Sequence, residues 1–460
     1  MQALENRRLF YSGDMAELYW NEMGLLMDQS RITNELEPLL VAIQKWKAVS
    51  LQDAISQRLQ QDMQPVDVLM TDETETKMLN ALKSLDYEED LPNFEEESLC
   101  DMARIAKDHL EAGQRLIFVD WTRYYDTLFM IAYDATDGRM WRSVVELDYS
   151  KIELWVNREL GVSSLQQGRI ERKRLRQFKK FKELTPILGG LLDFITPGDL
   201  VILCPSGVLH AIPLHAIPFP DKPLITSNPV VFCPSLSLLQ TCVNNVQGSA
   251  ILRTIPAVAF TRIGPGDPEE ESRVFEAARN GLSDDCLQTN VISGRDVTRD
   301  TFISHSRGAR LLHYHGHAHL EPVQRRDRAL QLEPQPASAT LYSDNGLLTV
   351  MDIFDLQLDS AVVLLLACAS GEDDVAPNDD PLGLLSAFLY SGASSVLATR
   401  WPTQTSDARE FAKRFYSIAF RSRKDSIINL AAAFQATVLS LWEDWDEDDP
   451  YHWAQFQLCK

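Results

Sequence analysis

The pattern of apolar and polar positions divides the chain near residue 110. Up to that point apolar residues recur at helical spacing, and no clear strand pattern is present. An acidic stretch over 86–90 followed by Leu91-Pro92 is typical of a loop or linker. We therefore expect a helical region over residues 1–110. The residues that carry this spacing are Leu36, Leu39, Leu40, Ile43 and Trp46, and later Met102, Ile105, Ala106 and Leu110.

After Gly113, short runs rich in β-branched and aromatic residues predict strands over 115–121, 126–133 and 200–204. A basic segment from Arg169 to Lys182 holds eight Lys or Arg residues. Its composition favours a solvated amphipathic helix, with a docking site for an acidic partner as the alternative.

From Ala257 onward, apolar strands alternate with helices. Strands are predicted over 309–314, 360–367 and 395–399, and helices over 298–308 and 382–390. The run 361–367 is apolar at every position, as a central parallel strand buried on both faces requires. This alternation predicts an α/β fold with a mostly parallel sheet and helices on both faces.

Composition narrows the classes of function. The 460 residues carry a net charge of -22, which disfavours nucleic acid as a partner because phosphate neutralisation needs a cationic surface. No apolar run is long enough for a membrane span, and the first residues lack the apolar core of a secretion signal. Seven scattered cysteines without a Cys-x-x-Cys pair indicate reduced thiols, so we expect a cytoplasmic protein.

Two reactive side chains follow strongly predicted strands. Cys368 ends the apolar run, and His317 follows the strand at 309–314. Ligands of open α/β sheets bind beyond the carboxyl ends of the strands, and a thiol needs a nearby imidazole to remove its proton. The interval of 51 positions from 317 to 368 agrees with the roughly 50 residues between the histidine and cysteine of caspases. Gly371 would let the chain turn sharply after the cysteine.

Other interpretations of these residues remain open. A cysteine at the end of an apolar strand is commonly an inert core residue. The alternating histidines His313, His315, His317 and His319 would share one side of an extended strand and could form a zinc site. No companion cysteine or carboxylate cluster stands at ligand spacing, so we expect no metal and no cofactor. A nucleotide-binding protein is disfavoured because neither phosphate-loop pattern is present.

Six ordered segments resemble the CHAT family of caspase-like peptidases, which is related to separase and often joined to tetratricopeptide repeats. Residues 312–318 resemble its histidine segment "His-Phe-Ala-x-His-Gly", and 365–371 resemble "LSACESG". The other segments are 199–216, similar to "PDG-LH-LPF-AL"; 234–239, similar to "PSL-LL"; 381–393 with 396–402, similar to "GLARAFLYAGA-SVVASLWPV"; and 453–456, similar to "YWA-F".

The resemblance implies a caspase-like sheet over residues 111–460, with an N-terminal half at 111–245 and a catalytic half at 246–460. It also implies a cysteine endopeptidase, in which Cys368 is the nucleophile and His317 the base. His315 is the alternative base, because it precedes Gly316 and restores the His-Gly pair of the family pattern. The oxyanion would be held by the N–H groups of Cys368 and Ala318, with Gly316 as a further candidate.

Relatives that cleave after basic residues hold the P1 side chain with carboxylates. Asp407, Asp373 and Asp374 are the candidates here, with solvated loop charges as the bland alternative. The acidic loop could instead bind calcium or serve as a cleavable activation segment. A catalytically silent caspase-fold scaffold is the competing class of function. The expected partners are a protein or peptide substrate for the peptidase and a regulatory protein bound through the N-terminal helices.

Overall fold

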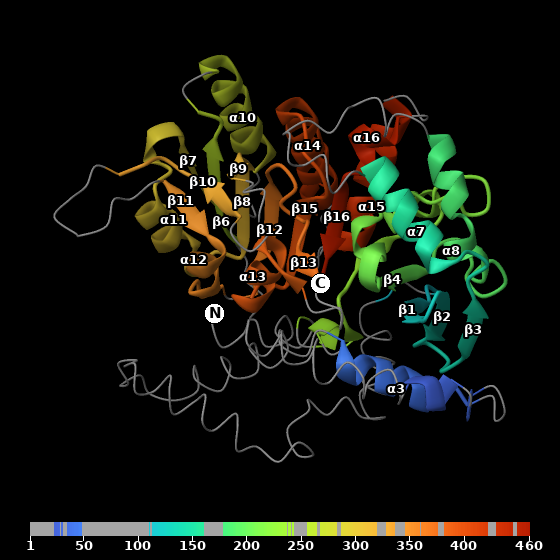
Figure 1. Ribbon diagram of the computed structural model, residues 1–460. Coiled ribbons are helices and arrows are strands. Elements are labelled where there is room, and N and C mark those ends of the chain that lie inside the picture. The colour runs from blue at the N-terminus through green and yellow to red at the C-terminus, as the bar shows by residue number, and fades with distance from the viewer. Residues whose placement is uncertain are drawn as a thin grey trace, which may run out of the picture.

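A computed structural model shows a long mixed sheet with helices on both faces (Figure 1). Three predictions fall outside the described residues: the helical spacing at 102–106, the linker at 86–92 and most of the basic segment, 169–177. The structure describes residues 23–27, 29–30, 35–47, 110, 113–160, 178–236, 238–240, 242, 255–264, 267–282, 287–319, 328–335, 346–358, 360–375, 381–421, 429–444 and 449–460.

Eleven strands form the main sheet, in the order β3-β2-β1-β4-β5-β16-β15-β12-β8-β6-β7. The N-terminal half of the sheet comprises β1 (Leu116–Tyr124), β2 (Thr127–Asp134), β3 (Met140–Val144), β4 (Leu200–Cys204) and β5 (Val230–Phe232). The C-terminal half comprises β6 (Ile255–Arg262), β7 (Leu287–Ser293), β8 (Leu311–Gly316), β12 (Val362–Leu366), β15 (Ser395–Thr399) and β16 (Phe456–Cys459).

The two halves are joined at β16 and run in opposite directions. Strand β16 is parallel to β5, where Cys459 pairs with Phe232, and antiparallel to β15, where Cys459 pairs with Val396. Strands β6, β7, β8, β12 and β15 are mutually parallel. The carboxyl ends of β4 and β12 therefore lie at opposite edges of one sheet.

Neighbouring residues of β8 show that both faces of the sheet are covered. His313 lies against Tyr416 of α14 (Thr405–Arg421), whereas Tyr314 lies against Phe302 of α11 (Arg299–Ser306). Successive side chains of a strand point to opposite faces, so the two helices cover opposite sides. Helices α10 (Pro268–Gly281) and α15 (Leu430–Asp444) pack with α14, and α12 (Val350–Phe354) packs with α13 (Leu384–Tyr390).

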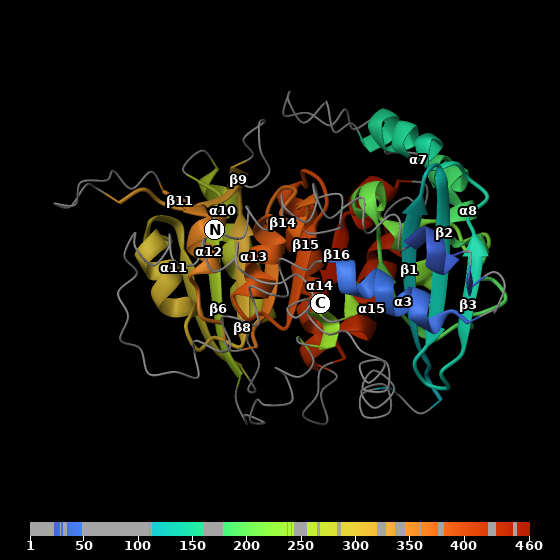
Figure 2. The same ribbon diagram turned by 60° about the horizontal axis from the view of Figure 1, so that its bottom comes forward.

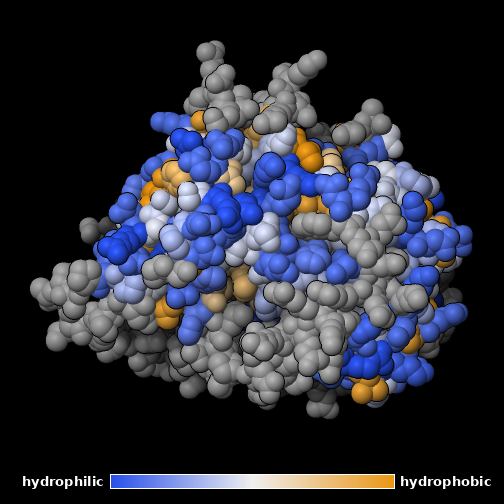
Figure 3. Space-filling view, turned by 90° about the horizontal axis from the view of Figure 1, so that it is seen from above, coloured by the Kyte–Doolittle hydropathy of each residue, from blue (hydrophilic) through white to orange (hydrophobic). Residues whose placement is uncertain are grey.

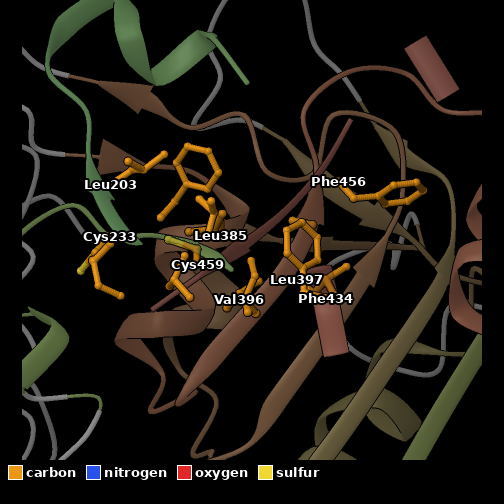
Figure 4. Packing of buried hydrophobic residues seen from close by; sticks show 14 of the residues in the cluster. Leu203, Cys233, Leu385, Val396, Leu397, Phe434, Phe456 and Cys459 are labelled. Atoms are coloured by element: carbon orange, nitrogen blue, oxygen red, sulfur yellow. The ribbon is translucent and has the colours of Figure 1, made fainter. Parts of the chain in front are cut away.

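Apolar side chains fill the junction between the halves (Figure 4). Leu203 comes from β4, while Val396 and Leu397 come from β15; all three are fully buried. Phe456 of β16 stacks on Phe411 of α14 with ring centroids 3.9 Å apart. The two halves therefore share one hydrophobic core. Burial of each such side chain stabilises the fold by about 1.5–3 kcal/mol.

The N-terminal region is held to the sheet by α3 (Glu37–Trp46), which lies below β1 to β3 in Figure 1. Leu39, Leu40 and Ile43 are buried, in agreement with their helical spacing. Beyond the end of the helix, the buried ammonium group of Lys47 lies 2.6 Å from Asp120 Oδ1 in β1.

The remaining elements are short helices and strands that lie between those of the main sheet along the chain. Across the described parts of the chain, no helix is long and apolar enough to cross a membrane. The short helices are α7 (Tyr149–Trp155), η1 (Val156–Leu160), η3 (Phe178–Leu184), α8 (Pro186–Gly189), η4 (Gly207–Ala211), η5 (Leu214–Ala216), η6 (Leu224–Thr226), η7 (Gly294–Asp296) and α16 (Pro450–Trp453). The short strands are β9 (Ala318–His319), β10 (Ala329–Gln331), β11 (Leu347–Thr349), β13 (Asp374–Val375) and β14 (Pro381–Leu382).

Candidate active site

His317 follows β8 directly and is exposed, with its Nε2 2.9 Å from the carbonyl oxygen of Ile263. Its own carbonyl accepts a hydrogen bond of 2.9 Å from the hydroxyl of Tyr314. The backbone at this position is therefore fixed by a buried tyrosine, while the imidazole ring lies at the surface of the carboxyl edge.

Cys368 lies two residues beyond β12, on a sharp turn. Ala369 has a φ of 50°, a left-handed conformation that side chains other than glycine rarely adopt. The turn is tied to the end of β15 and the loop that follows, because Gly371 N–H donates to Thr399 O at 2.8 Å and Ala369 N–H to Trp401 O at 3.2 Å. Cys368 is half-buried, with its Sγ 3.7 Å from Thr403 O. Burial raises the pKa of the Cys368 thiol, so the thiol is neutral near pH 7 without a base.

The register of β8 and β12 relates the two side chains. Leu366, the last residue of β12, pairs with His315, and Cys368 and His317 each follow two positions later in the chain. Parallel neighbouring strands lie about 4.8 Å apart, so both residues leave the sheet at adjacent points of one edge. The described residues contain no hydrogen bond between Cys368 Sγ and an imidazole ring. Hydrogen bonds between a nucleophile and its base are often long or poorly aligned before substrate binds.

His315 lies on the interior side of the same edge. It is 3% exposed, and its ring centroid is 5.9 Å from that of His313. Burial holds the pKa of His315 well below its usual range and lowers that of His313 to about 3. His313 Nδ1 is also 2.5 Å from the hydroxyl of Tyr416. The rings of His313 and His315 are therefore buried on the side of the sheet that α14 covers, whereas the ring of His317 is exposed.

The backbone around His317 offers a donor for an oxyanion. Gln331 N–H donates to His317 O at 2.9 Å, which makes Ala318 and Leu330 a non-hydrogen-bonded pair of the β9–β10 ladder. The N–H of Ala318 consequently points away from β10. Gly316 lies inside β8, where an added Cβ would come 2.6 Å from Arg262 O, so this position requires glycine.

The acidic loop after Cys368 is anchored by a buried arginine that the sequence patterns did not single out. Arg328 donates to Ala369 O at 2.8 Å, and its ion pair with Glu372 measures 2.7 Å. Asp373 accepts a hydrogen bond of 2.9 Å from Ser386 N–H, at the start of α13. Burial raises the pKa of Asp373 to about 6. Asp374 belongs to β13, and residues 379–380 lie outside the described residues.

Asp407 lies in the first turn of α14 and is 6% exposed. Its Oδ2 is 2.7 Å from His452 Nδ1, and its Oδ1 is 3.3 Å from the hydroxyl of Ser406. The helix begins two residues after Thr403, whose carbonyl contacts the thiol of Cys368. Asp407 is therefore linked to the nucleophile turn through one short segment.

Metal binding finds no support in the described part of the chain, where no group of three or more His, Cys, Asp or Glu side chains could hold an ion. Figure 3 views the molecule from the top of Figure 1, the side on which α10 and α14 follow the strands of the C-terminal half. Among the residues coloured by hydropathy, this face is mainly hydrophilic, with small hydrophobic patches between the polar residues.

Residues 186–460 match the CHAT domain model, and the chain belongs to the CHAT family. A human relative, tetratricopeptide repeat protein 28, is 31% identical over 112 residues, which are 24% of this chain and 4% of that protein. This chain therefore spans only a small part of that relative's length.

A solved structure of separase supports the fold. Saccharomyces cerevisiae separase, in its complex with securin, superposes with a TM-score of 0.52 and 12% identity, over 79% of this chain and 30% of that chain. An arginine-specific cysteine proteinase, gingipain R, is also similar, with a TM-score of 0.39, 12% identity and coverage of 61% of this chain and 66% of that one. The fold is caspase-like, as the sequence segments imply.

Proposed function

We propose that this chain is a cysteine endopeptidase in which Cys368 is the nucleophile and His317 the general base. The proposal rests on the strand register, which brings the residues that follow β8 and β12 to adjacent points of one edge. The exposed ring of His317 and the half-buried thiol of Cys368 support it.

In this mechanism His317 removes the thiol proton, and Sγ bonds to the carbonyl carbon of the scissile peptide. The oxyanion is stabilised by the N–H groups of Cys368 and Ala318. The C–N bond then breaks, and the imidazolium returns its proton to the leaving amine. Water, deprotonated by the same ring, hydrolyses the thioester and releases the acid. Because burial raises the pKa of Cys368, this route depends on the base.

His317 is favoured over His315 by exposure. A base must exchange protons with substrate and water, and the ring of His315 is buried with its Nε2 enclosed. The pKa of His315 is held well below its usual range, which makes its ring a weak proton acceptor.

Within the same proposal, the substrate carries a basic P1 residue whose cation meets Asp407. Support comes from the position of this carboxylate after Thr403 and from its Oδ1, which has a long hydrogen bond to Ser406. Asp373 and Asp374 are the other candidates, and their loop begins four residues after the nucleophile. The contact between Asp407 and His452 would weaken as the substrate cation binds.

The deciding experiment is labelling of the full chain with acyloxymethyl ketone peptides that carry Arg or Asp at P1. We expect the P1 Arg probe to label wild-type protein and Cys459→Ser, whose altered cysteine is buried away from the turn, but not Cys368→Ala. Asp407→Asn should weaken labelling by the Arg probe alone. Labelling of Cys368→Ala at the wild-type level would refute the assignment.

A silent interaction module is the second candidate function. The observation in its favour is that no hydrogen bond joins the thiol of Cys368 to a histidine among the described residues. In that case the N-terminal helices, including α3, would bind a regulatory protein, and Cys368→Ala would bind it with unchanged affinity. The partner can be sought with the Cys368→Ala variant, which also traps substrates of an active enzyme.

A further inference from the structure

A cavity of about 510 Å3 lies between the two halves of the molecule. Val156 and Val208 line it from the N-terminal half, together with Phe232 at the end of β5. Leu385 of α13 and Cys459 of β16 line it from the other half, near Cys233 in Figure 4. Its volume falls within the range of about 300–1,000 Å3 that is typical of small-molecule sites.

Arg400, which follows β15 directly, contributes a buried cation to the wall of this cavity. It is 7% exposed, and its Nη1 donates to His210 O at 2.7 Å. Its guanidinium carbon lies 4.4 Å from the ring centroid of Phe232. Its Nε is buried without a hydrogen bond, and no carboxylate within the described residues forms an ion pair with it. Burial lowers the pKa of Arg400 to about 9, so the side chain still carries its charge near pH 7.

The carboxylates in the same wall already have partners. Glu372 forms its ion pair with Arg328, and Glu153 lies 3.7 Å from Arg123. Asp373 accepts the hydrogen bond from Ser386 N–H. Glu372 acts on Arg400 from a distance and raises its pKa slightly, but the two form no ion pair. A bound anion that contacts the guanidinium directly would therefore stabilise Arg400 further.

We propose that this cavity binds a small organic carboxylate with an apolar body, and that Arg400 holds the carboxylate. One guanidinium neutralises one negative charge and can form two parallel hydrogen bonds to a carboxylate. A phosphate dianion would carry a second negative charge next to Glu372. The apolar side chains of Val208, Phe232 and Leu385 suit a hydrocarbon or aromatic body.

The cavity shares Asp373 and the end of the turn at Gly371 with the candidate active site, but neither Cys368 nor His317 lines it. Arg400 stands between Thr399 and Trp401, whose carbonyls accept the N–H groups of Gly371 and Ala369. Side chains alternate along β15, so Arg400 points to the face covered by α13. The binding proposal depends on this geometry and not on the proposed peptidase activity.

The test is isothermal titration of the full chain with three probes: 4-phenylbutyrate, its neutral amide 4-phenylbutanamide, and inorganic phosphate. We expect the carboxylate to bind at least about ten-fold more tightly than the amide, since charge-assisted hydrogen bonds are roughly twice as strong as neutral ones. Phosphate should bind more weakly than the carboxylate. Arg400→Gln should remove the preference for the carboxylate over the amide.

A second pair of variants keeps the test decisive where Arg400→Gln fails to fold. Asn157 is exposed and lines the cavity, so Asn157→Trp should fill part of it without disturbing the core, whereas Asn157→Ala should bind as wild type. We expect Asn157→Trp to weaken binding of 4-phenylbutyrate at least about ten-fold.

The proposal is overturned by any of four results: equal affinity for the acid and the amide, no binding of the acid at millimolar concentration, tighter binding of phosphate, or wild-type binding by Asn157→Trp. Repeating the titrations with Cys368→Ala separates this outcome from the fate of the peptidase assignment, because binding needs no catalysis.

Discussion

In each half of the sheet, one buried parallel strand has a cysteine at or just after its carboxyl end. The surroundings of these two cysteines differ. At the end of β4, Cys204 is fully buried, and the ammonium group of Lys47 lies 3.6 Å from its sulfur. At the end of β12, Cys368 is half-buried beside the strand that leads to His317. The end of a strand is a candidate site where its cysteine is partly accessible and a histidine follows the neighbouring strand.

The cover over the first strand end is itself polar. Lys47 Nζ donates to the carbonyls of Cys204 and Pro205 at 3.2 Å each, in addition to Asp120 Oδ1. Gln44 of α3 donates to Asp120 Oδ2 and accepts from Leu236 N–H at 2.7 Å. The groups that a substrate could have used at this edge are therefore occupied by the N-terminal region.

The largest effect is expected from exchanging the two cysteines for alanine in turn. Cys368→Ala should lower cleavage of a P1 Arg peptide by about 10³-fold or more, because the nucleophile is removed. Cys204→Ala should leave the rate within about two-fold, since its thiol is enclosed. Rates of peptide hydrolysis measure both. Equal loss in the two variants would erase the distinction between the halves.

Replacing the histidines one at a time sharpens the comparison at the open edge. His317→Ala should lower the rate of cleavage by about 10²–10⁴-fold, as expected for loss of a general base. His305→Ala, at an exposed position of α11, serves as the control and should cleave as wild type. If His315→Ala loses activity while its thermal unfolding stays unchanged and His317→Ala remains active, the assignment of the base moves to residue 315.

Removing the cation at the covered edge should change stability. Lys47→Met removes the ion pair with the buried carboxylate of Asp120, which costs about 3–5 kcal/mol of the free energy of unfolding. Adding Asp120→Asn should recover part of the loss, because the remaining buried charge is then removed. Urea unfolding of the three proteins measures this. A loss below about 1 kcal/mol would mean that α3 contributes little to this edge.

The smallest effect on stability is expected at Asp373, which lines the cavity between the two halves of the sheet. Its pKa is raised to about 6, so the folded state binds its proton more tightly than the unfolded state does, and this contribution to stability is lost as pH rises from about 4 to 6. Asp373→Asn mimics the protonated acid and should be more stable than wild type at pH 7 by up to about 3 kcal/mol. The difference should vanish at pH 4. Thermal unfolding at both pH values measures it, and a pH-independent difference would contradict the cause given.

Strongly patterned segments were predictable from the sequence. Strands β4 and β15 were predicted with their observed bounds, and Thr298 caps α11 through a hydrogen bond from Thr301 N–H. Strand β12 was predicted by its unbroken apolar run, although it begins at Val362. The helix expected to end near Gly308 ends at Ser306.

What the sequence left unpredicted depends on distant partners. Strand β7 is half-exposed, and its sequence shows no clear alternation of apolar and polar residues. It is stabilised by pairing with β6 over its whole length. The split of the histidine run arises because α14 covers His313 and His315, which no local pattern encodes. Lys47, Arg328 and Arg400 are single charged residues whose burial follows from contacts across the fold, so no motif marks them.

The pairing of β16 with β5 has a consequence for how the molecule folds. Residue 459 pairs with residue 232 across about half of the chain, so the two halves of the sheet merge through contacts of very high sequence separation. Such closure is slow relative to local pairing. Until it occurs, β5 and β15 both present unpaired edges that can recruit strands from other molecules. Shielding of these two edges by a chaperone during refolding should therefore raise the yield of native protein.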